Sequence, residues 1–391
     1  MRIGMIVASL SRHGGGVSLA VRELTRALVK KGIEVDVFAG ADACSAEDQR
    51  DWQATAIHVL PVVGPSAFGY QPSLLKLLRA SQLDCIHLHG LWMYGSLAAQ
   101  RMKRYGIPTI ISPHGMLDPW ALSNSAWKKR VAWATFERRN VRGATTLHAL
   151  NASEAEAFKK LGLENRIEII PNGIDSSYFE KPTSPESWEN ALPTGAKILL
   201  FLGRLHPKKG IFELIDGFSR AALRPEMALW HLVIAGWDDG GHLEKLKALV
   251  QNQGLSQRIH FIGPIFSDAK VRALQVADGF ILPSFSEGLP IAALEAWATG
   301  TPTIISPQCN LDIAFSCSAS LQVLPEPESI ASACIELATM PAHAANGMAG
   351  RAKNLIEREF NWDEIALKMI DAYHRTTGSS LPTHGAKSQP K

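Results

Sequence analysis

Two cations near the middle of the chain have the types and spacing to bind a phosphate-bearing ligand. Arg204 and Lys209 belong to the segment Gly-Arg-Leu-His-Pro-Lys-Lys-Gly, which directly follows the apolar run 198–202. The forked guanidinium of arginine can bind two phosphate oxygens at once, and lysine supplies a compact positive charge. Together they could hold a diphosphate, although cations that follow a strand are more often simply solvent-facing.

Two glutamates stand eight positions apart behind a second apolar run. Glu287 and Glu295 belong to Pro-Ser-Phe-Ser-Glu-Gly-Leu-Pro-Ile-Ala-Ala-Leu-Glu, in which Pro290 favours a helix start. Glu287 then lies in the loop and Glu295 about one turn inside the helix, roughly 7–8 Å further along its axis. This separation suits two contacts to one extended ligand, because carboxylates accept hydrogen bonds from paired sugar hydroxyls. The helix macrodipole also favours acids at a helix start, but it does not explain Glu287 in a loop.

Three successive glycines follow the first apolar run. The segment Ser11-Arg-His-Gly-Gly-Gly-Val-Ser leads into a predicted helix from about Leu19. Glycine lets a backbone approach a ligand closely, and a helix N-terminus offers free N–H groups to an anion. The segment matches neither the dinucleotide fingerprint nor a P-loop, so a dehydrogenase is not indicated and a tight turn is the plain alternative.

The apolar pattern predicts the elements that position these motifs. Short β-branched runs alternate with helical stretches over 2–170 and again over 198–323, a βαβ rhythm typical of parallel sheets. The segment 181–195 between them contains three prolines and few aliphatic residues. We therefore predict an α/β fold of two Rossmann-like domains with parallel sheets that face each other across a cleft. The predicted domains are 1–182, completed by a C-terminal helix at 360–376, and 195–359, followed by a disordered tail at 377–391.

Composition narrows the class of protein. The 391 residues are 46% apolar and 20% charged with a formal net charge of +3, which excludes a disordered chain or a disulfide-stapled mini-protein. The longest apolar runs are too short for a membrane-spanning helix. Five cysteines without a C-x-x-C pair favour a reducing compartment. We therefore expect a cytoplasmic protein.

Basic residues gather in the stretch 101–142. Within it, 127–142 interleaves aromatic residues with cations, a pattern typical of a helix on an anionic membrane surface. A solvated helix whose Trp133 and Phe136 pack on the core explains the pattern equally well. Peripheral attachment to the inner face of the cell membrane thus stays open, whereas no nucleic-acid-binding signature occurs. The cations are Arg101, Lys103, Arg104, Lys128, Lys129, Arg130, Arg138, Arg139 and Arg142, against Asp118 and Glu137.

These segments resemble the retaining glycosyltransferases of family 4, which have the GT-B fold. The resemblance covers nearly the whole chain and includes Gly-Arg-Leu-x-Pro-Lys-Lys-Gly, the two glutamates eight apart, Ser-Pro-His-Gly-Met, Pro-Asn-Gly-Ile-Asp and the closing Phe-Asn-Trp-Asp. It implies that Arg204 and Lys209 hold the donor diphosphate, Glu287 the transferred sugar and Glu295 the ribose. At 308–320 the chain has serines where relatives commonly carry glycines, so the resemblance does not define the backbone there.

The resemblance also implies supporting roles in both domains. The first domain would be the acceptor side and the second the side that binds the nucleotide-sugar donor. His114 would face the sugar from the first domain. The backbone contacts would come from Gly15 and Gly16 beside the diphosphate and acceptor, from the vicinity of Ile265 to the base, and from Gly288, Leu289 and Ile291 to phosphate and sugar.

The implied function is hexosyl transfer from a UDP- or GDP-linked sugar to a saccharide acceptor, lipid-linked by our interpretation, in exopolysaccharide, O-antigen or capsule synthesis. The chain contains no D-x-D metal motif, so fixed cations would stabilise the leaving diphosphate without a metal or other cofactor. His87 and His89 share a strand face, but without a third ligand nearby a core or cleft role is favoured. A sugar-nucleotide 2-epimerase of the same architecture and a non-catalytic nucleotide-sugar-binding scaffold are the alternatives.

Overall fold

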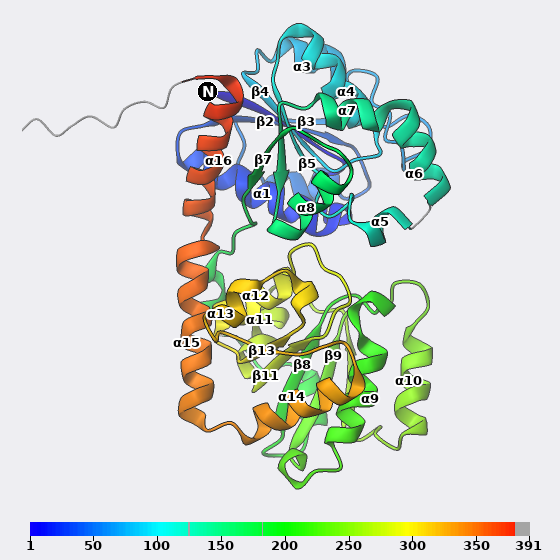
Figure 1. Ribbon diagram of the computed structural model, residues 1–391, viewed down its shortest axis with the longest axis vertical. Helices are drawn as coiled ribbons and strands as arrows, with labels where there is room; N and C mark the ends of the chain where they lie inside the picture. The colour runs from blue at the N-terminus through cyan, green and yellow to red at the C-terminus, as the bar shows by residue number, and fades with distance from the viewer. Residues whose placement is uncertain (124–125, 182, 380–391) are drawn as a thin grey trace, which may run out of the picture. The chain divides into compact units, whose positions relative to one another are not determined.

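The chain folds as two compact units, each built on one parallel sheet (Figure 1). The computed structural model describes residues 1–123, 126–181 and 183–379. Unit one consists of Met1–Gly173 together with the C-terminal segment that begins at Trp362, and unit two comprises Ile174–Asn361. The C-terminal tail predicted at 377–391 falls mostly outside the described residues.

The boundary between the units lies ahead of the segment 181–195, where the sequence predicts the connection. The described residues of this segment, 181 and 183–195, belong to unit two, and the short 3₁₀ helix at Ser187–Ala191 is anchored there. The Glu189 carboxylate accepts hydrogen bonds from Arg272 Nε at 2.8 Å and Nη2 at 2.6 Å. A proline-rich composition therefore marks an irregular segment here, but one that is packed on its unit.

The sheet of unit one has seven strands in the order β3-β2-β1-β4-β5-β6-β7, all paired in parallel. Alternate residues of the strands enter two separate cores on the two faces of the sheet, as the period of two demands. Strand β4 is buried along its whole length, and this burial includes its two histidines, His87 and His89. The strands are β1 (Arg2–Val7), β2 (Glu34–Gly40), β3 (Ala56–Leu60), β4 (Cys85–His89), β5 (Thr109–Ser112), β6 (Thr146–Ala149) and β7 (Arg166–Ile169).

Helices cover both faces of this sheet. The last helix, α16, lies beside α1 on one face, where Met369 and Tyr373 share a core with Val21 and Leu28 (Figure 1). The other face is covered by α3, α4 and α8. The helices are α1 (Gly15–Lys30), α2 (Ser45–Asp48), α3 (Leu74–Ala80), α4 (Tyr94–Met102), α5 (Pro119–Ser123), α6 (Ala126–Ala132), α7 (Arg138–Gly143), α8 (Ala152–Lys160) and α16 (Trp362–Thr377).

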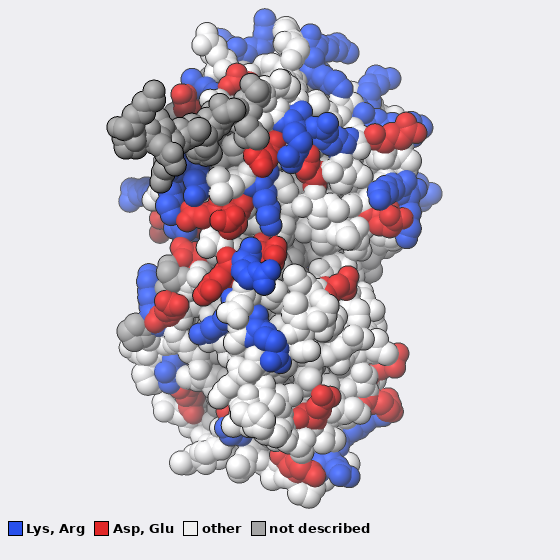
Figure 2. Space-filling view, turned by 60° about the vertical axis from the view of Figure 1, so that its left-hand side comes forward, with Lys and Arg blue, Asp and Glu red and all other residues white. Residues whose placement is uncertain are grey.

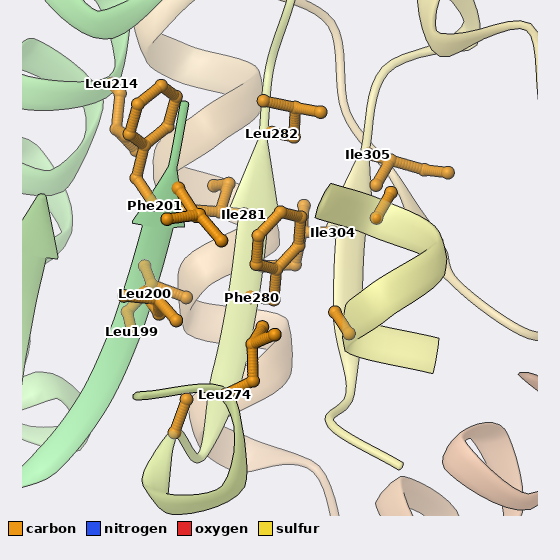
Figure 3. Packing of buried hydrophobic residues seen from close by; sticks show 14 of the residues in the cluster. Leu199, Leu200, Phe201, Leu214, Leu274, Phe280, Ile281, Leu282, Ile304 and Ile305 are labelled. Carbon is orange, nitrogen blue, oxygen red and sulfur yellow. The ribbon is translucent and has the colours of Figure 1, made fainter. Parts of the chain in front are cut away.

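The sheet of unit two has six parallel strands in the order β10-β9-β8-β11-β12-β13. Figure 3 shows its core, in which Phe201 and Phe280 from neighbouring strands pack with Leu214 of α9 and Leu274 of α11. The strands are β8 (Lys197–Leu202), β9 (Trp230–Ala235), β10 (Ile259–Gly263), β11 (Gly279–Leu282), β12 (Thr303–Ile305) and β13 (Leu321–Gln322). The helices are α9 (Ile211–Ala221), α10 (Leu243–Asn252), α11 (Ser267–Val276), α12 (Ile291–Thr299), α13 (Asp312–Ser316), α14 (Pro327–Thr339) and α15 (Ala342–Glu359).

The predicted α/β class with two parallel sheets is confirmed. In each sheet the strand order reverses beside its first strand in sequence, between β1 and β4 in unit one and between β8 and β11 in unit two. Ligands of open parallel sheets bind beyond the carboxyl ends of the strands at such a reversal. The loops that follow β1, β4, β8 and β11 are therefore the places to look for a site.

Candidate functional site

The loops after β8 and β11 bring two predicted site residues into contact. Lys209 Nζ donates to Glu287 Oε1 at 2.5 Å, and Ser284 Oγ donates to the same oxygen at 2.6 Å. The side chains of Lys209 and Glu287 are only 13% and 7% exposed. Burial would raise the pKa of Glu287, but the Lys209 charge and the two hydrogen bonds outweigh it and hold the pKa below its usual value. Glu287 is therefore a carboxylate at neutral pH.

A glycine makes this contact sterically possible. Gly210 caps α9 in the left-handed conformation, with a φ of 67°. A Cβ atom at this position would collide with the carbonyl oxygen of Pro283. The two loops are further tied by the Phe285 amide, which donates to the Lys208 carbonyl at 2.8 Å. The glycine that closes the Lys-Lys-Gly motif thus lets the loop after β11 approach closely enough for Glu287 to reach Lys209.

A third loop, after β12, supports Glu287 from its other side. The Glu287 amide donates to the Gln308 carbonyl at 3.0 Å, and Asn310 Nδ2 donates to the Glu287 carbonyl at 2.5 Å. Asn310 has a φ of 56°, a left-handed conformation that asparagine tolerates better than most residues. Sequence reasoning missed Asn310. The only signal was its position in the stretch 308–320, which departs from the family pattern.

The other side chains predicted to bind the nucleotide sugar, Arg204 and Glu295, each form an ion pair of their own near Lys209 and Glu287. Arg204 Nη1 lies 2.7 Å from Asp239 Oδ2, and both side chains are partly exposed. Glu295 is buried in α12 and accepts from Lys270 Nζ of α11 at 2.5 Å. Burial raises the pKa of Glu295, and Lys270 offsets this only in part. Asp239 and Lys270 carry no sequence motif, so only the structure identifies them as partners.

The predicted backbone contacts lie at the same edge of the sheet. Gly288, Leu289 and Ile291 surround the N-terminal end of α12, where the first N–H groups of a helix lack intrahelical partners. Gly288 leaves open space where a side chain would be. Ile265 lies two residues beyond β10 and packs partly on the core. The structure thus gathers the unit-two candidates along the carboxyl ends of β8, β10 and β11.

In unit one, the predicted glycines open onto solvent. Gly15 and Gly16 are exposed at the start of α1, and no atom lies within 4 Å of the place that a Cβ atom would take. The loop before them is anchored by Asp42, whose Oδ2 accepts from Ser11 Oγ at 2.7 Å. Burial would raise the pKa of Asp42, but hydrogen bonds from four neighbouring residues lower it overall. The glycine loop is therefore held in place while its backbone stays accessible.

His114 lies in the loop after β5, and its backbone adopts a φ of 54°. Its Nε2 is 3.1 Å from His89 Nδ1 on β4, and the two rings stack. Burial lowers the pKa of His114 to about 3, so the imidazole is neutral. The structure thus pairs His114 with one member of the His87-Leu-His89 motif.

The other member, His87, belongs to a buried hydrogen-bond chain. Its Nδ1 lies 2.8 Å from the Tyr373 hydroxyl, and its Nε2 lies 2.6 Å from Ser112 Oγ. Ser112 Oγ is also 2.6 Å from His148 Nδ1, and His148 Nε2 is 2.7 Å from the Ile170 carbonyl. A carbonyl only accepts, so His148 Nε2 donates, Ser112 donates to His148, His87 Nε2 donates to Ser112, and Tyr373 donates to His87.

These hydrogen bonds give His87 a structural role in the core, which the sequence favours over a metal-binding role. Both of its ring nitrogens are occupied, and through Tyr373 they fasten α16 to the sheet. Within 1–123, 126–181 and 183–379, no three His, Cys, Asp or Glu side chains converge as a metal site would require.

The basic segment 127–142 divides into an inward and an outward part. Trp133 and Phe136 pack against Trp92 and Phe68, as the solvated-helix interpretation expects. Trp127 and its neighbours in α6 instead face solvent, with Trp127 64% exposed. Glu137 is fully buried and accepts from the Trp92 amide, so it does not neutralise the exposed cations.

Charge elsewhere on the surface is mixed. Figure 2 shows a face on which basic and acidic side chains lie interspersed. None of the helices in the described part of the chain has both the length and the apolar character to span a bilayer.

Two family models match consecutive parts of the chain. The model described as a glycosyl transferase 4-like domain matches residues 15–173, and that of glycosyl transferases group 1 matches residues 183–344. Together they account for most of the described part of both units.

Individual relatives match over four fifths or more of their length. A D-inositol 3-phosphate glycosyltransferase from Arthrobacter sp. (strain FB24) is 26% identical over 96% of this chain and 93% of its own. A GDP-mannose:cellobiosyl-diphosphopolyprenol alpha-mannosyltransferase from Xanthomonas oryzae pv. oryzae is 25% identical over 81% of this chain and 80% of its own.

Solved structures share the fold. Sucrose-phosphate synthase from Thermosynechococcus elongatus superposes with a TM-score of 0.76 at 21% identity, over 97% of this chain and 100% of that one. Anabaena HepE in complex with UDP and glucose superposes with a TM-score of 0.76 at 18% identity, over 96% of this chain and 100% of that one. The chain therefore belongs to the group 1 glycosyltransferases and has the GT-B fold that its resemblance to family 4 implies.

Proposed function

We propose that this protein transfers a hexosyl group from a nucleotide-diphosphate sugar to a saccharide acceptor, with retention of the anomeric configuration. The contact between Lys209 and Glu287 is the observation that carries the proposal, because it joins a cation for phosphate to a carboxylate for sugar hydroxyls. Only one of the three N–H donors of Lys209 is needed for Glu287. The others are free to meet a phosphate oxygen, so one lysine can couple sugar binding to leaving-group stabilisation.

The chemistry follows from where charge develops. Cleavage of the sugar–phosphate bond builds negative charge on the departing diphosphate, and preorganised cations and helix N-termini stabilise it. Arg204, Lys209 and the first N–H groups of α12 take this role. The resemblance to family 4 implies front-face attack, in which the departing phosphate accepts the proton of the acceptor hydroxyl. Glu287 then orients the sugar as an anion and performs no proton transfer.

Metal independence is part of the proposal. It is supported by two cations at the carboxyl edge of unit two, Arg204 and Lys209, each paired with a carboxylate and each able to donate to the leaving diphosphate as well. Transfer should persist after exhaustive treatment with EDTA. Loss of transfer that is restored by magnesium or manganese would overturn this part.

The donor is a UDP- or GDP-linked sugar and the acceptor a lipid-linked saccharide of polysaccharide synthesis. Support comes from one relative named for GDP-mannose and a diphosphopolyprenol acceptor, and from a structural neighbour that holds UDP and glucose. The exposed basic part of the segment 127–142 supports the proposal that the protein binds an anionic membrane surface on the cytoplasmic side.

A panel of nucleotide sugars tests the donor. We expect UDP-glucose or GDP-mannose to raise the melting temperature, because a ligand that binds only the folded state stabilises it. The stabilising donor should then yield product with a lipid-linked saccharide, and NMR of the product should show the donor's anomeric configuration. An inverted product would overturn retention, and donor turnover that yields only epimerised sugar nucleotide would favour the epimerase alternative.

Vesicle flotation tests the membrane role. The protein should float with phosphatidylglycerol vesicles, and a variant with Trp127→Ala and Lys128→Ala should float less. Phosphatidylcholine vesicles are the control for charge. Equal recovery with and without anionic lipid would remove the membrane from the proposal without affecting the transfer reaction.

A further inference from the structure

A glutamate on α8 joins two segments of unit one. Glu154 lies in the first turn of α8, three residues after the cap residue Asn151, and its side chain is buried. Its Oε2 accepts from the Leu150 amide at 2.8 Å, and its Oε1 accepts from the Gly115 amide at 2.7 Å. In an ordinary capping box the glutamate serves only its own helix start. Here one of its oxygens holds the loop that follows β5.

The loop that receives this hydrogen bond has an uncommon backbone. His114 and Gly115 have φ values of 54° and 75°, so two successive residues are left-handed. This conformation is strained for a residue with a Cβ atom, and it persists where surrounding contacts enforce it. His89 fixes the imidazole of His114 at its Nε2. The Met116 amide closes the turn by donating to the Pro113 carbonyl at 3.2 Å, and Glu154 ties the backbone of this turn to α8.

The charge state of Glu154 matters for this hold. Both of its oxygens accept from N–H donors, so a proton on either removes the negative charge and weakens these hydrogen bonds. Burial raises the pKa of Glu154 to about 7, the two amides oppose the rise, and the nearby Asp118 adds to it. Across the described ranges of the chain, no Lys or Arg forms an ion pair with this carboxylate.

We infer that Glu154 is a positioning residue for His114, because its carboxylate holds the loop 113–115 in the left-handed conformation that sets the direction of the imidazole. The inference rests on the proposed function, in which His114 contacts the transferred sugar. Glu154 touches no substrate in this scheme. Its replacement changes turnover through His114 and leaves the charged pairs of unit two as they are.

Glu154→Gln is the direct test. Glutamine keeps the size of the side chain, but its NH₂ group opposes one of the two N–H donors at every pH. We expect kcat to fall about tenfold or more, because small displacements of a substrate-positioning group are costly. The affinity for UDP or GDP alone should stay that of the wild type. In the wild type, kcat should decrease as the pH is lowered through an apparent pKa near 7. In the variant, kcat should not show this decrease.

Glu156→Gln is the matched control. Glu156 lies on the same helix, 55% exposed, and pairs with Lys159 at 3.8 Å. Its replacement should leave kcat and its pH dependence unchanged. Asn151→Ala is the control for stability, because it removes the helix cap but not the bond to Gly115. Asn151→Ala should lower the melting temperature but leave kcat at the wild-type value.

A double variant separates positioning from a general structural effect. If Glu154 acts through His114, adding Glu154→Gln to His114→Ala lowers kcat no further. If Glu154→Gln fails to fold, Glu154→Asp, which is too short to reach both amides, takes its place in the same cycle.

The outcomes distinguish this inference from the proposed function. Full kcat in folded Glu154→Gln, or losses that multiply in the double variant, would overturn the positioning role. Full kcat in His114→Ala would instead overturn the contact between His114 and the sugar, and with it the part of the proposed function on which the inference rests.

Discussion

The two sheets share one strand order, but their carboxyl edges carry contrasting chemistry. In unit two the polar side chains at this edge are ionised and paired, as Lys209 is with Glu287. In unit one a buried chain of neutral imidazoles and a hydroxyl, formed by His87, Ser112 and His148, lies at this edge alongside separate carboxylates such as Asp42 and Glu154. An incoming diphosphate can replace one partner of an ion pair, whereas an added proton breaks a chain of neutral donors and acceptors. The same architecture thus suits an anionic ligand in one unit and a fixed neutral network in the other.

Of the changes considered, removal of a charge from the site in unit two should lower activity the most. We expect Glu287→Ala or Lys209→Ala to lower kcat/KM about 10²–10³-fold, the range for loss of one preorganised electrostatic contact. Steady-state kinetics with the donor identified by thermal shift measures this. Each variant also leaves a buried charge unpaired, so its melting temperature should fall as well.

Glu244→Ala is the control for this experiment. Glu244 is an exposed acid on α10 that pairs with Lys247 on the same helix. It should leave both turnover and stability unchanged, as surface pairs contribute little. Wild-type turnover in Glu287→Ala would contradict the assignment of the site.

Acid should act on unit one through its neutral histidines. Burial lowers the pKa of His148 to about 4, while the unfolded chain titrates near 6.5. The unfolded state therefore binds the proton first, so stability is complete above pH 6.5 and is lost as the pH falls toward 4. His148 alone should cost about 2 kcal/mol of unfolding free energy between pH 7.5 and pH 5.

Urea unfolding at these two pH values measures the loss. His148→Gln should be less stable at both values because it disrupts the chain to Ile170, yet its difference between them should be smaller by about the same 2 kcal/mol. An identical pH difference in wild type and variant would show that His148 is not the group that titrates.

Asn310 tests how far the charged site depends on its supporting loop. We expect Asn310→Ala to lower kcat/KM about tenfold, because Glu287 loses the amide that holds its backbone. Asn310→Gly keeps the left-handed backbone and removes only the side chain. Similar activity losses in both variants would assign the effect to the amide. Unchanged activity in both would show that the loop after β11 holds Glu287 without help.

Ser318 should give the smallest effect, and of opposite sign. It is exposed just after the end of α13 and has a φ of 52°. Ser318→Gly relieves the left-handed strain and keeps the carbonyl that accepts from Arg351, so it should stabilise unit two by about 0.5–1 kcal/mol. Ser316→Gly, within α13 itself, should destabilise instead, and chemical denaturation distinguishes the two.

The sequence by itself determined the elements and the class of the molecule. The repeated βαβ rhythm predicted two parallel sheets, because strand and helix periods are local properties of the chain. Arg204, Lys209 and Glu287 were identified by their types and by their places directly behind apolar runs. Ligands of parallel sheets bind beyond the carboxyl ends of the strands, which agrees with the positions of these motifs directly after strands.

Only the tertiary structure decided which side chains are partners. Lys209 meets Glu287, 78 positions away, because β8 and β11 are neighbours in the sheet, and Gly210 lets their loops touch. Asp239, Lys270, Asn310 and Glu154 carry no motif, and they acquire their contacts from the order of strands and the course of the loops. The same holds for His87, whose spacing from His89 allowed a metal pair until Ser112 and Tyr373 occupied both of its nitrogens. Local patterns encode which groups reach an edge of a sheet, whereas the packing of distant segments sets which of those groups bind each other.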